Sequence, residues 1–512
     1  MGIIYQKDNR SGITYAYQNE AYWDKTKKMS RAKRTLIGRV VNGEIVPTDG
    51  RCKKDKKPKG QCRQETRHMF YGATYLLDRI AESIGLKTDL RICFPEIYDQ
   101  ILSIAYYMIM EDSSPLYRFE KWHLTHWHPY GMDITSPRSS ELFSYITDEN
   151  ISSFFKRQWN RRTEEEYWAY DSTSISTYSR SLVQAEFGKN KENDLLPQIN
   201  LLLVFGEKSG LPFYYRKLSG KIPDCKTVKH LLEDLQILGF NKAKMVMDRG
   251  FYSEKNINDL YKDHVKFLIG CRMNLRFIQE LMKKNQSNVR NFRNFDSSNN
   301  TYGLTVKTNW GSHKIYGQLY HSTEKTVEDE ILFNTKLMSL TKELETNTFV
   351  ESHRDEYDEF FNYHRTSKGY KFTYKDDEIK KAQERFGYFA LLTNEEMDAK
   401  TALALYRMKD VVEKGFGNIK ERLNMRRLLV SSERSLDGKL FVAFIALIIV
   451  SQLNNLMKEG KLYDKYSMSL LLDKLEVIEC FKDPGHPMRI GEMTEKAREI
   501  YLALGITPPD SL

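Results

Sequence analysis

The 512-residue sequence has few cysteines and no long hydrophobic run. Its six cysteines are scattered and form no CxxC pair, which argues against a disulfide framework and indicates a reducing compartment. The longest apolar run, residues 440–450, is far shorter than the ~20 residues that span a bilayer. The start "MGIIYQKDNR" has no apolar signal-peptide core. We therefore expect a cytoplasmic protein without a membrane partner.

The positive charge is modest overall but concentrated near the N-terminus. The formal net charge is +10, and residues 25–67 alone hold fifteen Lys or Arg against four Asp or Glu. Aromatic residues lie close by, at Tyr15, Tyr17, Tyr22 and Trp23. A basic segment beside aromatic residues predicts a polyanionic partner, most plausibly nucleic acid. The alternative is a solvated loop, which the run "KKDKKPKG" alone would favour.

The chain is too long for a single core and its texture changes along its length. Residues 12–46 alternate as strands, with a hairpin signal at Asn42-Gly43. Residues 69–84 and 95–110 have helical periodicity. We expect these parts to form an N-terminal β-hairpin and helical DNA-binding region.

Strands and helices alternate between about residues 165 and 271. The runs "EYWAYDSTSIS", "QINLLLVFG" and "LPFYYRKLSG" predict three hairpin-connected strands, and helices separate the later strands "AKMVMD" and "VKFLIGC". This order predicts an α/β fold with a mixed sheet covered by helices. Residues 275–385 are more polar and predict a partly β insertion, after which an apolar strand and a long helix follow.

Two aspartates lie on predicted strands of this sheet. Asp248 ends the apolar run "KMVM", and the carboxyl end of a buried strand is where α/β proteins place their chemistry. The alternative is that Asp248 caps the helix beginning near Ser253 or pairs with Arg249. Asp171 lies on the first strand. Because the first and fourth strands can be neighbours in such a sheet, we expect Asp171 close to Asp248.

A glutamate on the predicted long helix completes the set. Tyr406, Lys409, Glu413 and Lys420 fall within about 60° of arc on that helix, adjacent to its apolar stripe. A salt-bridged surface is the alternative for this face. The predicted core stripe consists of Leu405, Met408, Val412, Phe416, Ile419 and Leu423.

Neighbouring carboxylates repel each other unless they share a proton or hold a cation. Together with Glu413, the aspartates Asp171 and Asp248 offer three hard oxygen donors, which suit Mg²⁺ or Mn²⁺. Two such ions about 3.5–4 Å apart support phosphodiester chemistry. We therefore expect these three acids to be the catalytic residues and the ligands of two divalent ions.

These motifs resemble the ribonuclease-H-like transposases. That family also has an acid on the first strand, an acid after the fourth in "DRGFYS", and a glutamate in a helix after a β insertion. The spacing Tyr406-x2-Lys409-x3-Glu413-x6-Lys420 is similar to the Tyr-Arg-Glu-Lys signature of bacterial insertion-sequence transposases of the DDE type. The resemblance covers about residues 12–455. It departs at Lys409, which takes the arginine position and lacks the bidentate guanidinium fork.

The resemblance implies cut-and-paste DNA transposition. Such an enzyme binds terminal inverted repeats, cleaves phosphodiester bonds and joins 3′-OH ends to target DNA with two divalent ions. Its partners would be double-stranded DNA, at the transposon ends and the target, and a second copy in a synaptic complex. It would act in the bacterial cytoplasm, associated with the nucleoid when bound to DNA. The implied DNA-binding residues are Tyr406, Lys409, Lys420 and Arg249.

The expected organisation has five parts. They are a DNA-binding region (1–160), a first part of the catalytic core (161–274), an insertion (275–385), a second part of the core with the glutamate helix (386–460), and a helical C-terminal region (461–512).

Three other functions stay open at this point. A metal-dependent nuclease of the same fold is the closest alternative. A non-catalytic DNA-binding protein derived from a transposase is another, although it would not need all three acids. A glycosidase also uses paired carboxylates, but basic segments suit a neutral sugar poorly.

Overall fold

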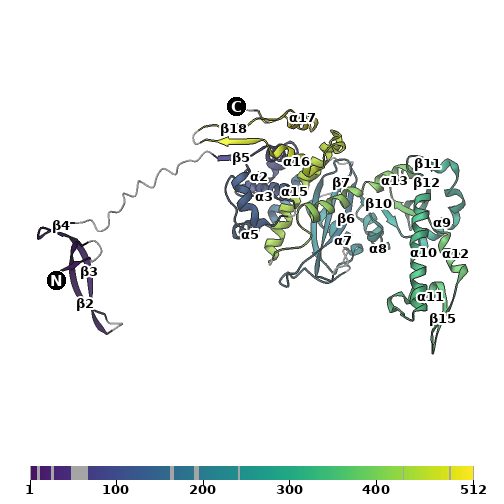
Figure 1. The fold of residues 1–512 in the computed structure, drawn as a ribbon. Coiled ribbons are helices and arrows are strands. Elements are labelled where there is room, and N and C mark those ends of the chain that lie inside the picture. Colours follow the sequence, from purple (N-terminus) through teal and green to yellow (C-terminus); the bar gives the residue numbers. More distant parts are fainter. Residues whose placement is uncertain are drawn as a thin grey trace. The chain divides into compact units, whose positions relative to one another are not determined.

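The computed structural model describes residues 2–8, 12–24, 28–47, 67–112, 114–161, 166–188, 195–239, 243–430, 432–483 and 486–510. The chain divides into two compact units (Figure 1). One unit comprises Met1–His68 with Phe481–Arg489 and Leu512, and the other comprises Met69–Cys480 with Ile490–Ser511. Much of the predicted basic segment, residues 48–66, lies outside the described residues.

The N-terminal unit contains a four-stranded antiparallel meander. Its strands are β1 (Gly2–Lys7), β2 (Thr14–Asp24), β3 (Met29–Val41) and β4 (Glu44–Pro47). The predicted turn is confirmed, because Asn42 and Gly43 both have positive φ, 54° and 85°, between paired Val41 and Glu44. Two consecutive positive φ values fit the type I′ turn that matches strand twist. The basic side chains of β3 are exposed at Arg31, Lys33, Arg34 and Arg39.

The large unit is built on a nine-stranded mixed sheet of order β11-β12-β13-β16-β10-β9-β6-β7-β8. The strands are β6 (Trp168–Ser176), β7 (Gln198–Gly206), β8 (Pro212–Ser219), β9 (Lys244–Met247), β10 (Lys266–Cys271), β11 (Phe295–Asp296), β12 (Thr301–Trp310), β13 (His313–Ser322) and β16 (Tyr388–Thr393). Strand β7 pairs antiparallel with both β6 and β8, while β9 is parallel to both β6 and β10. The predicted mixed α/β fold is therefore confirmed.

Helices connect and cover the strands of this sheet. Those between strands are α7 (Asp224–Leu238) and α8 (Glu254–Lys262). Helices before and after the sheet are α1 (Gly72–Ser83), α2 (Leu86–Cys93), α3 (Tyr98–Met110), α4 (Phe119–Thr125), α5 (Ser136–Tyr145), α6 (Asp148–Asn160), α15 (Glu433–Glu459), α16 (Met468–Glu476) and α17 (Glu495–Ala503). The remaining short strands are β5 (Arg67–Phe70), β17 (Glu479–Lys482) and β18 (Arg489–Ile490).

Helices α1–α6 share one hydrophobic core with the sheet and with α15. For example, the rings of Phe94 and Phe441 lie 4.9 Å apart, and Phe155 packs on Tyr215 of β8. Among the described helices, α15 alone is long and apolar enough to cross a membrane by length and composition. Its most apolar window is 78% buried inside the protein, which is typical of a core helix.

The inserted segment 275–385 has two structural parts. Strands β11–β13 extend the large sheet, because β13 pairs with β16, and α9 (Arg276–Val289) packs beside them. The second part has its own small core around Leu344 and Tyr357. It consists of α10 (Thr323–Glu345), α11 (Arg354–Phe360), β14 (Phe361–Thr366), β15 (Gly369–Tyr374) and α12 (Asp376–Gln383).

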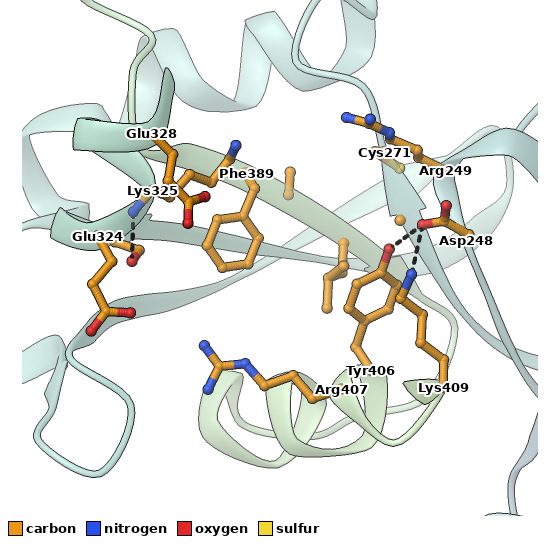
Figure 2. Close-up of a pocket in the computed structure, with 14 residues that line it drawn as sticks. Asp248, Arg249, Cys271, Glu324, Lys325, Glu328, Phe389, Tyr406, Arg407 and Lys409 are labelled. Carbon is orange, nitrogen blue, oxygen red and sulfur yellow. Dashed lines mark hydrogen bonds and ion pairs between the residues drawn. The ribbon is translucent and has the colours of Figure 1, made fainter. Parts of the chain in front are cut away.

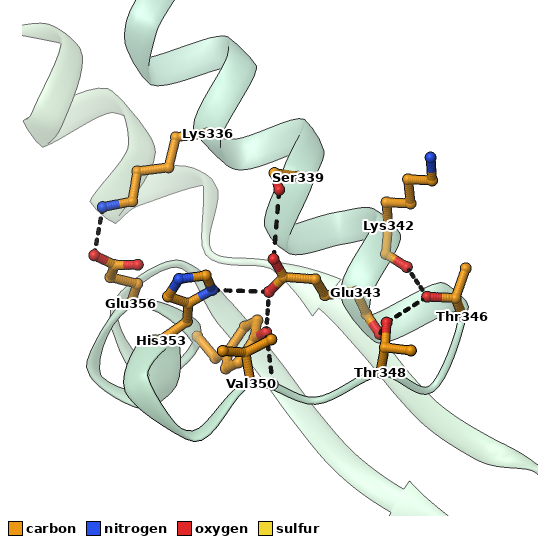
Figure 3. A network of polar contacts seen from close by, with 10 residues as sticks. Lys336, Ser339, Lys342, Glu343, Thr346, Thr348, Val350, His353 and Glu356 are labelled. Atoms are coloured by element: carbon orange, nitrogen blue, oxygen red, sulfur yellow. Dashed lines mark hydrogen bonds and ion pairs between the residues drawn. The ribbon is translucent and has the colours of Figure 1, made fainter. Parts of the chain in front are cut away.

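A polar network ties this small core together (Figure 3). The Glu343 carboxylate accepts hydrogen bonds from the Tyr357 hydroxyl and from Nδ1 of His353, the latter at 3.0 Å. Burial raises the pKa of Glu343, but the donors His353 and Tyr357 outweigh it, so its pKa is lowered. The network fixes the loop after α10 against α11.

Candidate active site

The two predicted aspartates follow directly paired residues on neighbouring strands. Tyr170 of β6 pairs in parallel with Met247 of β9, and the next residue on each strand is Asp171 and Asp248. The predicted adjacency of the first and fourth strands is therefore confirmed. The alternative role of Asp248 as a cap is excluded, because the Ser253 hydroxyl accepts the first-turn N–H of α8.

The helix that carries the glutamate is interrupted, whereas the sequence predicted one continuous helix. It consists of α13 (Ala399–Arg407), α14 (Asp410–Gly417) and a π turn, η5 (Asn418–Arg422). At the junction, the N–H groups of Met408 and Lys409 bond three residues back, as in a tighter 3-10 turn.

This turn changes the helical phase, so the predicted core stripe is wrong at Met408. Met408 is exposed, because the tight turn rotates its side chain away from the sheet. The residues of the stripe that follow the junction are buried as predicted: Val412, Phe416, Ile419 and Leu423.

Two residues of the glutamate helix, Tyr406 and Lys409, contact the carboxylate of Asp248 (Figure 2). The Tyr406 hydroxyl donates to Oδ1 of Asp248 at 2.6 Å. Nζ of Lys409 lies 3.3 Å from the same oxygen and 3.4 Å from Oε1 of Glu413. The structure thus brings Tyr406, Lys409 and Glu413 to Asp248.

The charges in this cluster shift each other's protonation. Burial raises the pKa of Asp248, but the hydrogen bond from Tyr406 and the charge of Lys409 outweigh it, so its pKa is lowered. Burial and the neighbouring Asp248 raise the pKa of Tyr406, which stays a neutral donor. Burial lowers the pKa of Lys409, but Asp248 and Glu413, with a smaller effect of Asp171, raise it overall. All three predicted acids therefore lie close enough to the Lys409 ammonium to raise its pKa.

The donor set fits a divalent cation in chemistry and charge. Asp171, Asp248 and Glu413 offer carboxylate oxygens, the ligands that Mg²⁺ and Mn²⁺ prefer. Within the part of the chain that the structure describes, no three His, Cys, Asp or Glu side chains are already close enough to form a metal centre. Metal binding would therefore require these side chains to move, and the ammonium of Lys409 stands between two of them.

The other predicted DNA-binding residues lie around the same site. Arg249 and Arg407 line a cavity of about 460 Å³ together with Asp248, and Arg407 also donates to the Asn299 side chain. Lys420 lies half-buried on the π turn η5, beyond Glu413. Of the predicted DNA-binding residues, Arg249, Tyr406 and Lys409 therefore line this cavity with Asp248, and Lys420 is not among the lining residues.

Several residues of this site were not predicted from the sequence. The far wall of the cavity is formed by Phe389 of β16 and by Glu324, Lys325 and Glu328 at the start of α10 (Figure 2). Asp224, in the first turn of α7, accepts a hydrogen bond from the hydroxyl of Ser172, the neighbour of Asp171. The apolar run "RFGYFALLTN" could have indicated a strand of the cavity wall, but its pairing with β10 and β13 is what places it beside the site.

Comparison with known proteins places the chain in a family. No curated protein matches it. Among solved structures it is similar to the cryo-EM structure of the piggyBac transposase synaptic complex with hairpin DNA, with a TM-score of 0.38 and 11% identity over 79% of this chain and 76% of that one. The family described as "Transposase DDE domain" matches residues 163–449, more than half of the chain and the span that holds all three acids. The protein therefore belongs to the DDE transposase family.

Proposed function

We propose that the protein is a cut-and-paste DNA transposase that binds terminal inverted repeats, cleaves phosphodiester bonds and joins 3′-OH ends to target DNA. One observation carries this proposal. Asp171, inside β6, and Asp248, just after β9, follow the last residue pair of two parallel strands, and the helix of Glu413 brings a third acid to the Lys409 ammonium beside Asp248. Family membership supports the same chemistry, since DDE transposases generally use divalent metal ions.

In this proposal Asp171, Asp248 and Glu413 hold two Mg²⁺ or Mn²⁺ ions. When bound, the ions supply an activated nucleophile and stabilise charge on the leaving oxygen. The protein's own contribution is to position the carboxylates that would bind the ions. The strand register fixes the two aspartates relative to each other, and Tyr406 orients the carboxylate of Asp248 through its 2.6 Å hydrogen bond.

The basic residues around the acids would contact the DNA strand that enters the site. Lys409 and Lys420 would clamp phosphates as point charges, and Arg249 would add a bidentate contact from the cavity wall. Tyr406 borders the same cavity and would face the cleaved end. The spacing of these residues is the basis for proposing a bacterial insertion-sequence type of transposase with a Tyr-Arg-Glu-Lys-like signature and a ribonuclease-H-like core.

The N-terminal β meander would bind the transposon ends. Its β3 strand exposes Arg31, Lys33, Arg34 and Arg39, and the neighbouring residues 48–66 add further basic charge in sequence. Sequence-specific end binding needs a surface of this kind beyond the catalytic core. We further propose that the enzyme acts as a homodimer in a synaptic complex in the bacterial cytoplasm, on the nucleoid when bound to DNA.

A gel assay with duplex DNA that carries the inverted repeats flanking the gene tests this function. Cleavage at the repeat ends and joined products with target DNA, in Mg²⁺ but not in EDTA, are expected. Cleavage without preference for the repeat ends would identify a nuclease instead. End binding without any cleavage would identify a DNA-binding protein that has lost catalysis.

A further inference from the structure

The ammonium of Lys409 contacts two of the three acids, Asp248 and Glu413, and its contact with Asp248 is drawn in Figure 2. Nζ lies 3.3 Å from Oδ1 of Asp248 and 3.4 Å from Oε1 of Glu413. The Lys409 side chain is 18% exposed, against 35% for Asp248 and 56% for Glu413. The cation is therefore more enclosed than either carboxylate that it contacts.

The local backbone gives no reason for a cation at this place. Lys409 is the N-cap residue of α14, where the helix dipole is positive and disfavours a further positive charge. The acids and the aromatic ring of Tyr406, whose centroid lies 5.2 Å from Nζ, offset this. Without a cation, the carboxylates of Asp248 and Glu413 would repel each other. The lysine charge thus does electrostatically what a bound metal ion would do.

The carboxylate of Asp248 already has three donors around it. Its carboxylate accepts hydrogen bonds from Tyr406, from Lys409 and from the backbone N–H of Arg249. A carboxylate has about four lone-pair sites, so one stays available. A divalent ion held by both Asp248 and Glu413 would need the carboxylate oxygens that Lys409 now contacts. Of the three donors, the ammonium of Lys409 is the one that a divalent cation repels.

We propose that Lys409 is a positioning residue that holds Asp248 and Glu413 together before metal binds, and that it is displaced when divalent ions enter. This inference rests on the proposed function, since it takes these acids as the metal ligands. Once displaced, the ammonium is available to a DNA phosphate. One side chain would thereby couple metal entry to contact with the DNA strand.

The experiment measures Mn²⁺ binding to the full chain without DNA by electron paramagnetic resonance. Lys409→Met keeps a long apolar side chain and removes the charge, so it should bind Mn²⁺ more tightly, by on the order of tenfold or more. Lys409→Arg keeps a cation and should retain the wild-type affinity. Lys400→Met is the matched control. It removes an exposed lysine of α13 that pairs with Asp296, and it should leave the Mn²⁺ affinity unchanged.

A second variant separates this inference from the function on which it rests. Asp248→Asn should lose Mn²⁺ binding, because it removes a ligand. If it does, and Lys409→Met binds Mn²⁺ no more tightly than wild type, the role of Lys409 is wrong while the metal site stands. If Asp248→Asn binds Mn²⁺ as wild type does, the metal site is wrong and both proposals fail.

Discussion

Tyr170 and Met247 pair across the parallel strands β6 and β9, and an aspartate follows each of them. Both residues are buried, at 1% and 0% exposure, so the core specifies the register of this pair. A shift by one residue would turn every side chain of a strand to the opposite face of the sheet. The relationship of Asp171 to Asp248 is therefore set by apolar packing beneath the site and not by the acids themselves.

The basic residues on the glutamate helix should differ in their effect on cleavage. At saturating Mg²⁺, Lys409→Ala and Lys420→Ala should each slow strand cleavage by about tenfold or more, because a charge-assisted contact is worth about 1.5–3 kcal/mol. Arg407→Ala should change it by no more than about twofold, since Arg407 is exposed and binds Asn299. Lys409→Arg should be tolerated or raise activity.

Single-turnover cleavage rates, with circular dichroism as the control for folding, check this order. An inactive Arg407→Ala protein beside a normal Lys409→Ala protein would show that the assigned face of the helix is wrong.

The N-terminal basic residues should carry much of the salt dependence of DNA binding. Each lost phosphate contact reduces the slope of log affinity against log salt by about 0.9. We expect a shallower slope when the lysines of residues 48–66 are replaced by glutamine, and also when Arg31, Lys33 and Arg34 are replaced. Fluorescence anisotropy between low and physiological salt measures both. Slopes equal to that of the wild-type chain would show that this region makes no phosphate contacts with the DNA.

A half-buried lysine outside the site should make stability depend on pH. Lys439 of α15 lines a cavity of about 330 Å³ with Tyr107, Phe143 and Leu423, and burial lowers its pKa to about 8. Within the described residues it forms no hydrogen bond or ion pair. The unfolded chain, with a lysine pKa of about 10.4, binds more protons between pH 8 and 10.4, so the folded state gains stability as pH rises through this window.

Lys439→Met should remove that rise. At pH 7 it should also stabilise the protein, by at most about 3 kcal/mol, because no charge is then buried. Urea unfolding at pH 7 and pH 9.5 measures both effects, and Lys474→Met, at an exposed position of α16, serves as the control. The same gain in stability with pH in Lys439→Met and in wild type would contradict the burial of this ammonium.

The succession of strands along the chain could be predicted because a local sequence signal marks each strand. Buried strands appear in the sequence as apolar runs, and Asn42-Gly43 specifies the turn between β3 and β4. A short turn joins β7 to β8, a longer segment joins β6 to β7, and helical crossovers place the next strands parallel. These constraints favour neighbouring first and fourth strands, and the observed β6–β9 pairing bears this out.

Other features of the site depend on contacts that no local signal reports. The break at Met408 lies inside a continuous helical pattern, and the change to a tighter turn leaves no mark on apolar spacing. Phe389 reaches the cavity because β16 pairs with β10, across a long intervening segment. The position of Lys409 between two acids depends on side-chain directions at that break.

The most direct test of the account is the cleavage activity of the Asp248→Ala protein. Repeat-end DNA is incubated with wild type and with Asp171→Ala, Asp248→Ala and Glu413→Ala in Mg²⁺, and end binding is measured on the same preparations. Each variant is expected to lose cleavage while its affinity for the ends stays close to that of wild type. Cleavage by Asp248→Ala at the wild-type rate would contradict it.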